Sequence, residues 1–197
     1  MKMERSICGK ALLGAACMFA ACMAWGQAGS EVQEPPRVEV ALTYDSALAN
    51  ITTGQESWME GGSLQLQGRV WGRFGIVADI AGLHTGHLNN SATGLDLITA
   101  TFGPRYTWTA AHRRVVFFGQ VLVGEAHGMN GEFPTSTTLN STANSFALQI
   151  GGGVNVPVTH RFAVRAFEAN WLRTQLPNAT TGVENNLRLG AGLVLGY

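Results

Sequence analysis

The chain has 197 residues, enough for one domain, and only 13% of them are charged, about half the share that is usual in soluble proteins. Thirteen basic residues less the three before position 27 leave ten, all arginines, and thirteen carboxylates less one leave twelve, so the net charge beyond position 26 is near −2. This balance argues against a nucleic-acid-binding protein, which needs a basic patch.

Residues 1–26 are predicted to be a secretory signal peptide. Three basic residues, Lys2, Arg5 and Lys10, precede an apolar stretch at 11–24 that is too short to span a membrane as a helix. Small residues allow cleavage either before Gln27 or after Ala28. All three cysteines fall inside this segment, so we expect no disulfide in the mature chain. Residues 27–36 form a polar, proline-containing lead-in.

From residue 37 onward, apolar and polar residues alternate in a series of segments. A period of two is typical of β-strands whose two faces meet different environments. The predicted strands are 37–45, 63–71, 74–83, 96–108, 114–125, 144–156, 161–172 and 186–197.

Two of these segments leave their orientation open. The segment 114–125 is apolar on both faces, so either Gln120 and Gly124 face inward or Gly119 and Glu125 do. In 161–172, Arg165 has one parity whereas Glu168 and Asn170 have the other. A β-bulge near Ala166–Glu168 would reconcile them; otherwise Glu168 and Asn170 lie near the outer rim.

The connections alternate between short and long. Short turns are predicted at Gly72, 110–113 and 157–160, and longer loops at 46–60, 84–94, 126–143 and 173–185. Short turns at one end and long loops at the other are characteristic of membrane-spanning barrels. We therefore predict that residues 37–197 form an all-β, eight-stranded antiparallel up-and-down transmembrane β-barrel.

The last predicted strand carries the clearest pattern. Between Asn186 and Tyr197, apolar residues alternate with polar, charged or very small ones, and the sequence ends on the aromatic residue. An outward aromatic at a strand end suits the aromatic girdle of a membrane barrel. We expect this strand to pair with 37–45 and so to remove the last open edge of the sheet.

With these features the chain resembles the small outer-membrane β-barrel proteins, in the manner of the outer-membrane-protein-A-like transmembrane domain. The residues that carry the resemblance are the terminal strand, Gly103-Pro104-Arg105 and Gly151-Gly152-Gly153. The resemblance implies location in the bacterial outer membrane, contact with its lipid, and recognition by the barrel assembly machinery. The assembly signal it implies is Leu193, Leu195 and Tyr197. We expect a monomer.

The polar residues of each strand should face the barrel interior. An eight-stranded barrel is only wide enough for its own side chains to fill it, and a buried arginine must be paired. We therefore expect an interior plugged by ion pairs and amides rather than a narrow pore for ions or small solutes. The expected network is Arg69, Asp79, Arg105, Gln149, Asn155, Arg165, Glu168 and Arg188.

Other functions receive less support from the residues. A secreted, soluble, lipocalin-like barrel that binds an apolar ligand would invert the two faces, but the polar set is rich in glycine and lacks lysine. A metal site could combine His84, His87 and His127, although solvated loop histidines are more common. No His-x-Ser pair of the lipid deacylases occurs. We expect no enzymatic activity and no cofactor.

Overall fold

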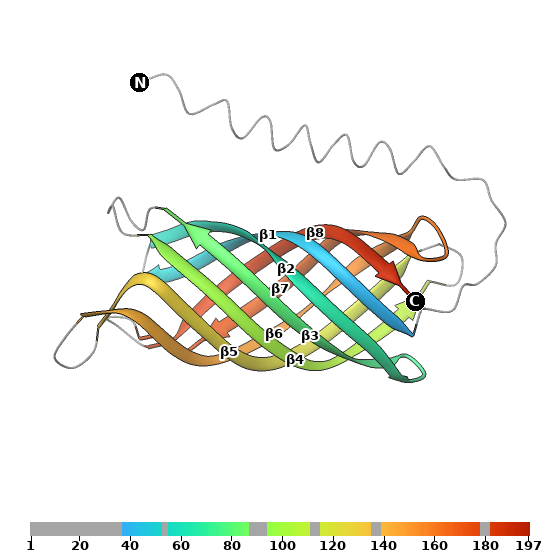
Figure 1. The fold of residues 1–197 in the computed structure, drawn as a ribbon, viewed down its shortest axis with the longest axis horizontal. Coiled ribbons are helices and arrows are strands. Elements are labelled where there is room, and N and C mark those ends of the chain that lie inside the picture. The colour runs from blue at the N-terminus through green and yellow to red at the C-terminus, as the bar shows by residue number, and fades with distance from the viewer. Residues whose placement is uncertain (1–36, 53–54, 87–93, 111–114, 135–138, 178–181) are drawn as a thin grey trace, which may run out of the picture. The chain divides into compact units, whose positions relative to one another are not determined.

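The computed structural model describes residues 37–197 except 53–54, 87–93, 111–114, 135–138 and 178–181. All its regular elements are strands that form one closed antiparallel barrel, in which each strand pairs with its sequence neighbours (Figure 1). The strands are β1 (Val38–Thr52), β2 (Gln55–Trp71), β3 (Phe74–Thr85), β4 (Leu95–Thr109), β5 (Val116–Pro134), β6 (Leu139–Pro157), β7 (Phe162–Thr174) and β8 (Glu184–Gly196). No helix that could cross a membrane occurs among the described residues.

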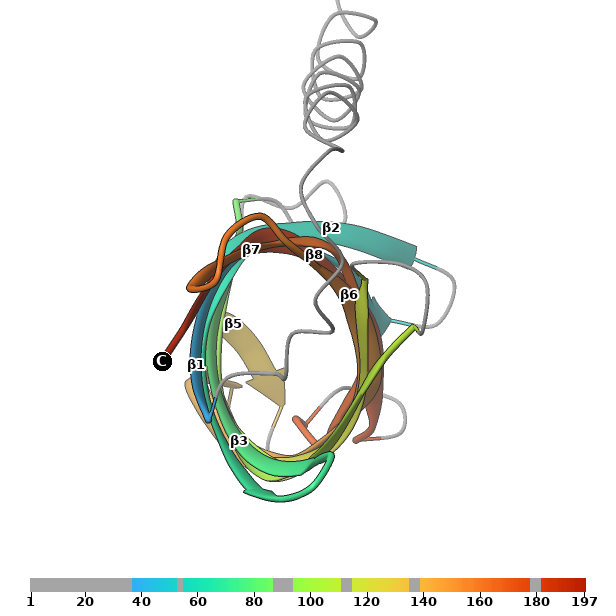
Figure 2. The ribbon, with the colours of Figure 1, turned by 90° about the vertical axis from the view of Figure 1, so that its right-hand side faces the viewer.

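Pairing of β1 with β8 closes the barrel, as the alternation of the terminal strand predicted. Val40 lies opposite Leu195 and Leu42 opposite Leu193, so apolar side chains face each other across the seam. The view along the barrel shows a continuous wall without an open edge (Figure 2). A closed sheet leaves no unpaired strand edge for another chain to join.

The two ends of the barrel differ. The connections β2–β3, β4–β5 and β6–β7, with both chain ends of the barrel, form what we call the turn end; the other four connections form the loop end. Gly72, in the β2–β3 turn, has a φ of 55°, which glycine adopts without strain. The strands extend well into two predicted loops, 46–60 and 126–143, so those predictions were wrong.

A bulge in β7 settles the conflict between Arg165 and Glu168. Opposite β8, Arg165 pairs with Gly192 and Glu168 pairs with Gly190, so β7 carries one extra residue. The register with β6 shifts at the same place. Since an extra residue reverses the parity of everything that follows, both side chains point into the barrel.

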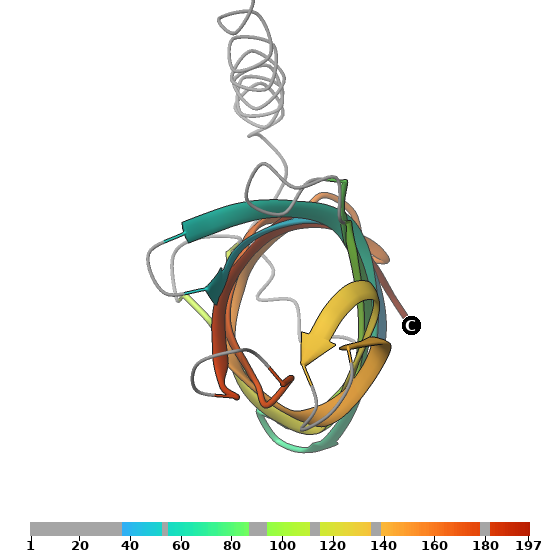
Figure 3. The same ribbon diagram turned by 90° about the vertical axis from the view of Figure 1, so that its left-hand side faces the viewer.

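The far part of β5 bends. Asn130 has a φ of 58°, and the register between β5 and β6 shifts between Met129 and Phe133. Figure 3 shows the end of β5 leaning across the opening at the loop end. Nearer the middle of the same strand, Gln120 is buried and Val121 is exposed, which answers the question that the apolar pattern left open.

The outer wall of the barrel is apolar and the interior is polar. Leu42, Phe102 and Leu193 are 63%, 61% and 50% exposed, whereas Arg105, Gln65 and Asp79 are at most 1% exposed. Near the turn end the outward aromatics Phe74, Tyr106, Trp108 and Phe117 contact one another in a row, with neighbouring ring centroids 4.9 to 5.9 Å apart. This distribution is the reverse of that in a soluble barrel.

Candidate functional site

The centre of the barrel is filled by a hydrogen-bonded network, and Gln65 on β2 connects its two halves. Its Oε1 accepts hydrogen bonds from Arg105 and Arg165, both at 2.5 Å. Its Nε2 donates to Glu168 at 2.8 Å and to Asp79 at 3.3 Å. One amide therefore bridges two cations and two anions, which a carboxylate or an ammonium at this position could not do.

Arg105 on β4 binds amide oxygens. Its Nη1 donates to Gln67 Oε1 at 2.8 Å, and its Nε donates to Gln120 Oε1 at 2.9 Å. Burial of a guanidinium is tolerated only where its N–H groups find acceptors. Gln67 on β2 and Gln120 on β5 supply these acceptors.

Glu168 and Arg165, both on β7, form a buried ion pair. Arg165 Nη1 lies 2.6 Å from Glu168 Oε2, and both side chains are at most 2% exposed. The other oxygen of Glu168 accepts from Gln120 at 3.1 Å and from Asn170 at 2.7 Å. Arg165 Nε donates to Asn155 Oδ1 at 3.0 Å. Every atom that carries the charge of this pair is thus held by the protein except Arg165 Nη2.

Asp79 forms the second half of the network with Arg188. The carboxylate accepts a hydrogen bond from Arg188 Nη2 and another from Gln149 Nε2 at 3.0 Å. Arg188 Nε lies 3.9 Å from Asp45 Oδ2, and Thr43 donates to Asp45 at 3.2 Å. Two carboxylates therefore flank this arginine.

Phe118 on β5 is an interior residue that the sequence did not reveal. Its ring lies 4.3 Å from the Arg105 guanidinium and 4.6 Å from that of Arg165. A cation over an aromatic face is stabilised by the ring quadrupole, most when both are desolvated. Phe118 was hidden because its strand is apolar on both faces. Gln120 and Asp45 also belong to the network. The alternation placed Asp45 on the polar face of its strand but left the orientation of Gln120 open.

An apolar layer closes the interior on the loop-end side of this network. On β1, Ala47 is the next inward-facing residue after Asp45 in the direction of the loop end. On β7, which also runs towards the loop end, Leu172 is the next inward-facing residue after Asn170. The layer is a cluster of buried residues: Ala47, Met59, Leu83, Leu95, Leu97, Ala126, Ala147, Leu172 and Leu176. These side chains carry no charge and no hydrogen-bonding group.

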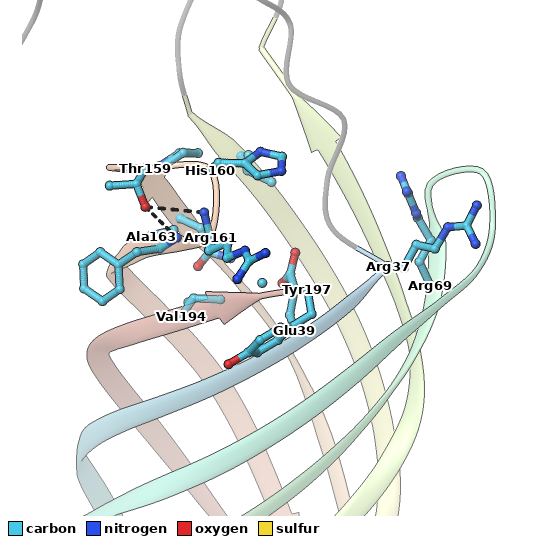
Figure 4. A pocket seen from close by; sticks show the side chains of 14 residues that line it. Arg37, Glu39, Arg69, Thr159, His160, Arg161, Ala163, Val194 and Tyr197 are labelled. Carbon is cyan, nitrogen blue, oxygen red and sulfur yellow. Dashed lines mark hydrogen bonds between the residues drawn. The ribbon is translucent and has the colours of Figure 1, made fainter.

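The turn end, in contrast, is hollow. A cavity of about 470 Å³ opens there between the starts of β1 and β7 and the ends of β2, β6 and β8. Arg69 lines it and is half-buried, so it lies at the edge of the interior rather than at its centre. Figure 4 shows Arg37 and Arg69 on one side of the mouth and His160 and Arg161 on the other. Asn155 and Glu39 also line the cavity.

The histidines considered as metal ligands lie apart. His84 on β3 contacts Asp96 at 2.5 Å, and His127 on β5 contacts Asn144 on β6. The strand β4 separates the two histidines, and His87 lies outside the described residues. Within the described part of the chain no three His, Cys, Asp or Glu residues are grouped to hold a metal ion.

Comparison with known proteins shows which solved structures share this fold. No protein-family model matches the chain, and no curated protein matches its sequence. Among solved structures, Neisserial surface protein A superposes with a TM-score of 0.63 at 13% identity, over 83% of this chain and 99% of that one. Ail, the attachment invasion locus protein of Yersinia pestis, superposes with a TM-score of 0.52 at 15% identity, over 82% and 99%.

These two structures share the closed barrel of this chain. Ail is an outer-membrane protein, and another structure shows it with the heparin analogue sucrose octasulfate, at a TM-score of 0.53 and 16% identity over 82% of this chain and 99% of that one. The fold is that of the small bacterial outer-membrane barrels. This confirms the all-β, eight-stranded antiparallel barrel predicted from the sequence.

Proposed function

We propose that the protein is an integral barrel of the bacterial outer membrane with a structural or surface-interaction role, and that its interior does not conduct. The observation that carries the proposal is the inversion of the two faces. Apolar side chains cover the outside, and arginines, carboxylates and amides fill the inside. Lipid is the solvent in which that arrangement is stable, because a closed barrel satisfies every backbone group within the wall.

The same inversion argues against the soluble, lipocalin-like alternative. Such a barrel would need an apolar cavity at its centre, where this chain has Arg105, Arg165 and Arg188. Membrane fractionation tests the proposal. We expect the protein in the outer-membrane fraction, extractable only with detergent and with heat-modifiable gel migration; recovery from the soluble periplasm without detergent would refute it.

A plugged interior is supported over a narrow pore by two barriers in series. The network binds the buried charges to one another, and the apolar layer around Leu83, Leu97 and Leu172 follows it towards the loop end. Conductance of the purified protein in planar bilayers tests this point. We expect no stable unitary conductance, and a persistent open level would show a pore.

The loop end is the surface proposed for interaction, and its charge limits the partners. Towards this end the described carboxylates Glu60 and Glu125 are exposed and Asp96 is half-buried, with Arg173 as an exposed cation. A polyanion such as the sulfated sugar bound to Ail would meet carboxylates here and be repelled. We infer that the partner is neutral or cationic at its contact surface, and heparin-agarose retention at physiological salt would contradict this.

A further inference from the structure

We propose that the cavity at the turn end is a binding site for a phosphate group, held by Arg37, Arg69 and Arg161. Nothing in the proposed role as a closed barrel requires this site. The proposal rests on the shape of the cavity, on the residues that line it, and on the distribution of charge between the two ends of the barrel.

The cavity is closed on one side and open on the other. Its volume of about 470 Å³ falls in the range of small-molecule pockets. The central network and the apolar layer lie between it and the loop end, so a ligand can enter only from the turn end. In an outer-membrane protein with short periplasmic turns, that side faces the periplasm.

The lining suits a phosphate. Three arginines contribute to it, together with the carboxylate of Glu39. A guanidinium matches phosphate oxygens with two parallel N–H donors, which makes arginine the preferred residue for such anions. His160 lies beside Arg161 in the same wall (Figure 4).

The turn between β6 and β7 holds Arg161 in place. Thr159 Oγ1 accepts from the backbone N–H of Phe162 at 3.1 Å and from that of Arg161 at 3.4 Å. The backbone N–H groups of Val158 and Thr159 both donate to Phe162 O at 2.9 Å. Because the turn is fixed by its own hydrogen bonds, the guanidinium is presented from a defined backbone position.

The cavity also has an apolar part. Val116, Phe162, Ala163 and Val194 line it together with the arginines. A bare inorganic anion would leave this surface unused, whereas a phosphate that carries an organic group would cover it. The ligand class that fits is therefore a phosphate ester, either soluble or the headgroup of a phospholipid.

The charges of the barrel as a whole favour entry of an anion at this end. Arg73 lies in the adjacent β2–β3 turn. Exposed carboxylates such as Glu60 lie towards the opposite end. A cleft lined by one sign of charge raises the local concentration of the opposite ion.

Binding is tested with the folded full chain in nonionic detergent, by ³¹P NMR titration with inorganic phosphate and with glycerol phosphate. A second arm uses nanodiscs of phosphatidylcholine with and without phosphatidylglycerol, and counts the anionic lipids retained by the purified protein. The test variant is Arg37→Gln/Arg161→Gln, since both side chains are exposed and line the cavity. The matched control is Arg73→Gln, an exposed arginine of the same end outside the cavity lining.

We expect saturable binding that is weakened about tenfold or more in the double variant and changed less than twofold in the control. Binding of the free esters assigns a soluble ligand, and selective retention of phosphatidylglycerol assigns a headgroup; both support the site. The proposal is overturned if no source binds saturably, or if Arg73→Gln loses as much affinity as the double variant.

Discussion

Neutralising Glu168 should strongly destabilise the barrel, because its carboxylate is the buried counter-ion of Arg165. Glu168→Gln preserves the size of the side chain and one acceptor oxygen, but it removes the negative charge 2.6 Å from Arg165. The guanidinium, which is 0% exposed, is then left without a counter-ion at hydrogen-bond distance.

The magnitude follows from burial. Breaking a buried ion pair by removing one partner costs about 3 to 5 kcal/mol, because the remaining charge is desolvated and uncompensated. Arg165→Met should cost a similar amount through the uncompensated carboxylate. The double variant buries no unpaired charge at these two positions, so its loss should be smaller than the sum of the single losses by about 2 kcal/mol.

Equilibrium urea unfolding in lipid vesicles, followed by heat-modifiable gel migration and tryptophan fluorescence, measures the three free energies of unfolding. Glu125→Gln serves as the control, since Glu125 is an exposed carboxylate on β5. Additive losses in the double variant, or a loss in Glu168→Gln no larger than in the control, would refute the idea that this pair holds the network together.

Two further predictions concern the closing seam. Tyr197→Asp should lower the yield of folded barrel in the cell without abolishing refolding in detergent, because the outward aromatic (69% exposed) is the proposed assembly signal; normal membrane yield would remove that role. Gly192→Val should prevent closure, since a Cβ at this position would lie 2.0 Å from the backbone oxygen of Leu42. Gly68→Val is its control, since a Cβ there meets no atom within 4 Å, and equal folding of both variants by gel migration would contradict the close approach.

Much of the barrel could be predicted because lipid and a polar interior impose opposite demands on alternate residues. Asp79 and Arg188 were placed inside from parity alone, although they are 109 residues apart in the chain, and the structure brings them together. The conflict between Arg165 and Glu168 pointed to a bulge, because two charges of opposite parity in one strand cannot both face inward without an extra residue.

The strand ends, Phe118 and the apolar layer could not be predicted, because the alternation of apolar and polar residues is missing or ambiguous there. The sequence at 46–60, and at the corresponding ends of β5 and β6, is polar and lacks a clear alternation of apolar residues, so these strand ends read as loops. Phe118 was invisible because both faces of its strand are apolar. The inward leucines of the loop-end layer, such as Leu172, are identified as interior only once the register is known.

The most direct measurement of the central claim is quenching of tryptophan fluorescence by brominated lipid chains. Trp58, Trp71, Trp108 and Trp171 are all exposed on the barrel. In vesicles, variants that retain only Trp71, Trp108 or Trp171 should be quenched by bromine on the acyl chains and protected from acrylamide in the water. Fluorescence that brominated lipid leaves unchanged while acrylamide quenches it fully would show that the apolar face does not contact lipid.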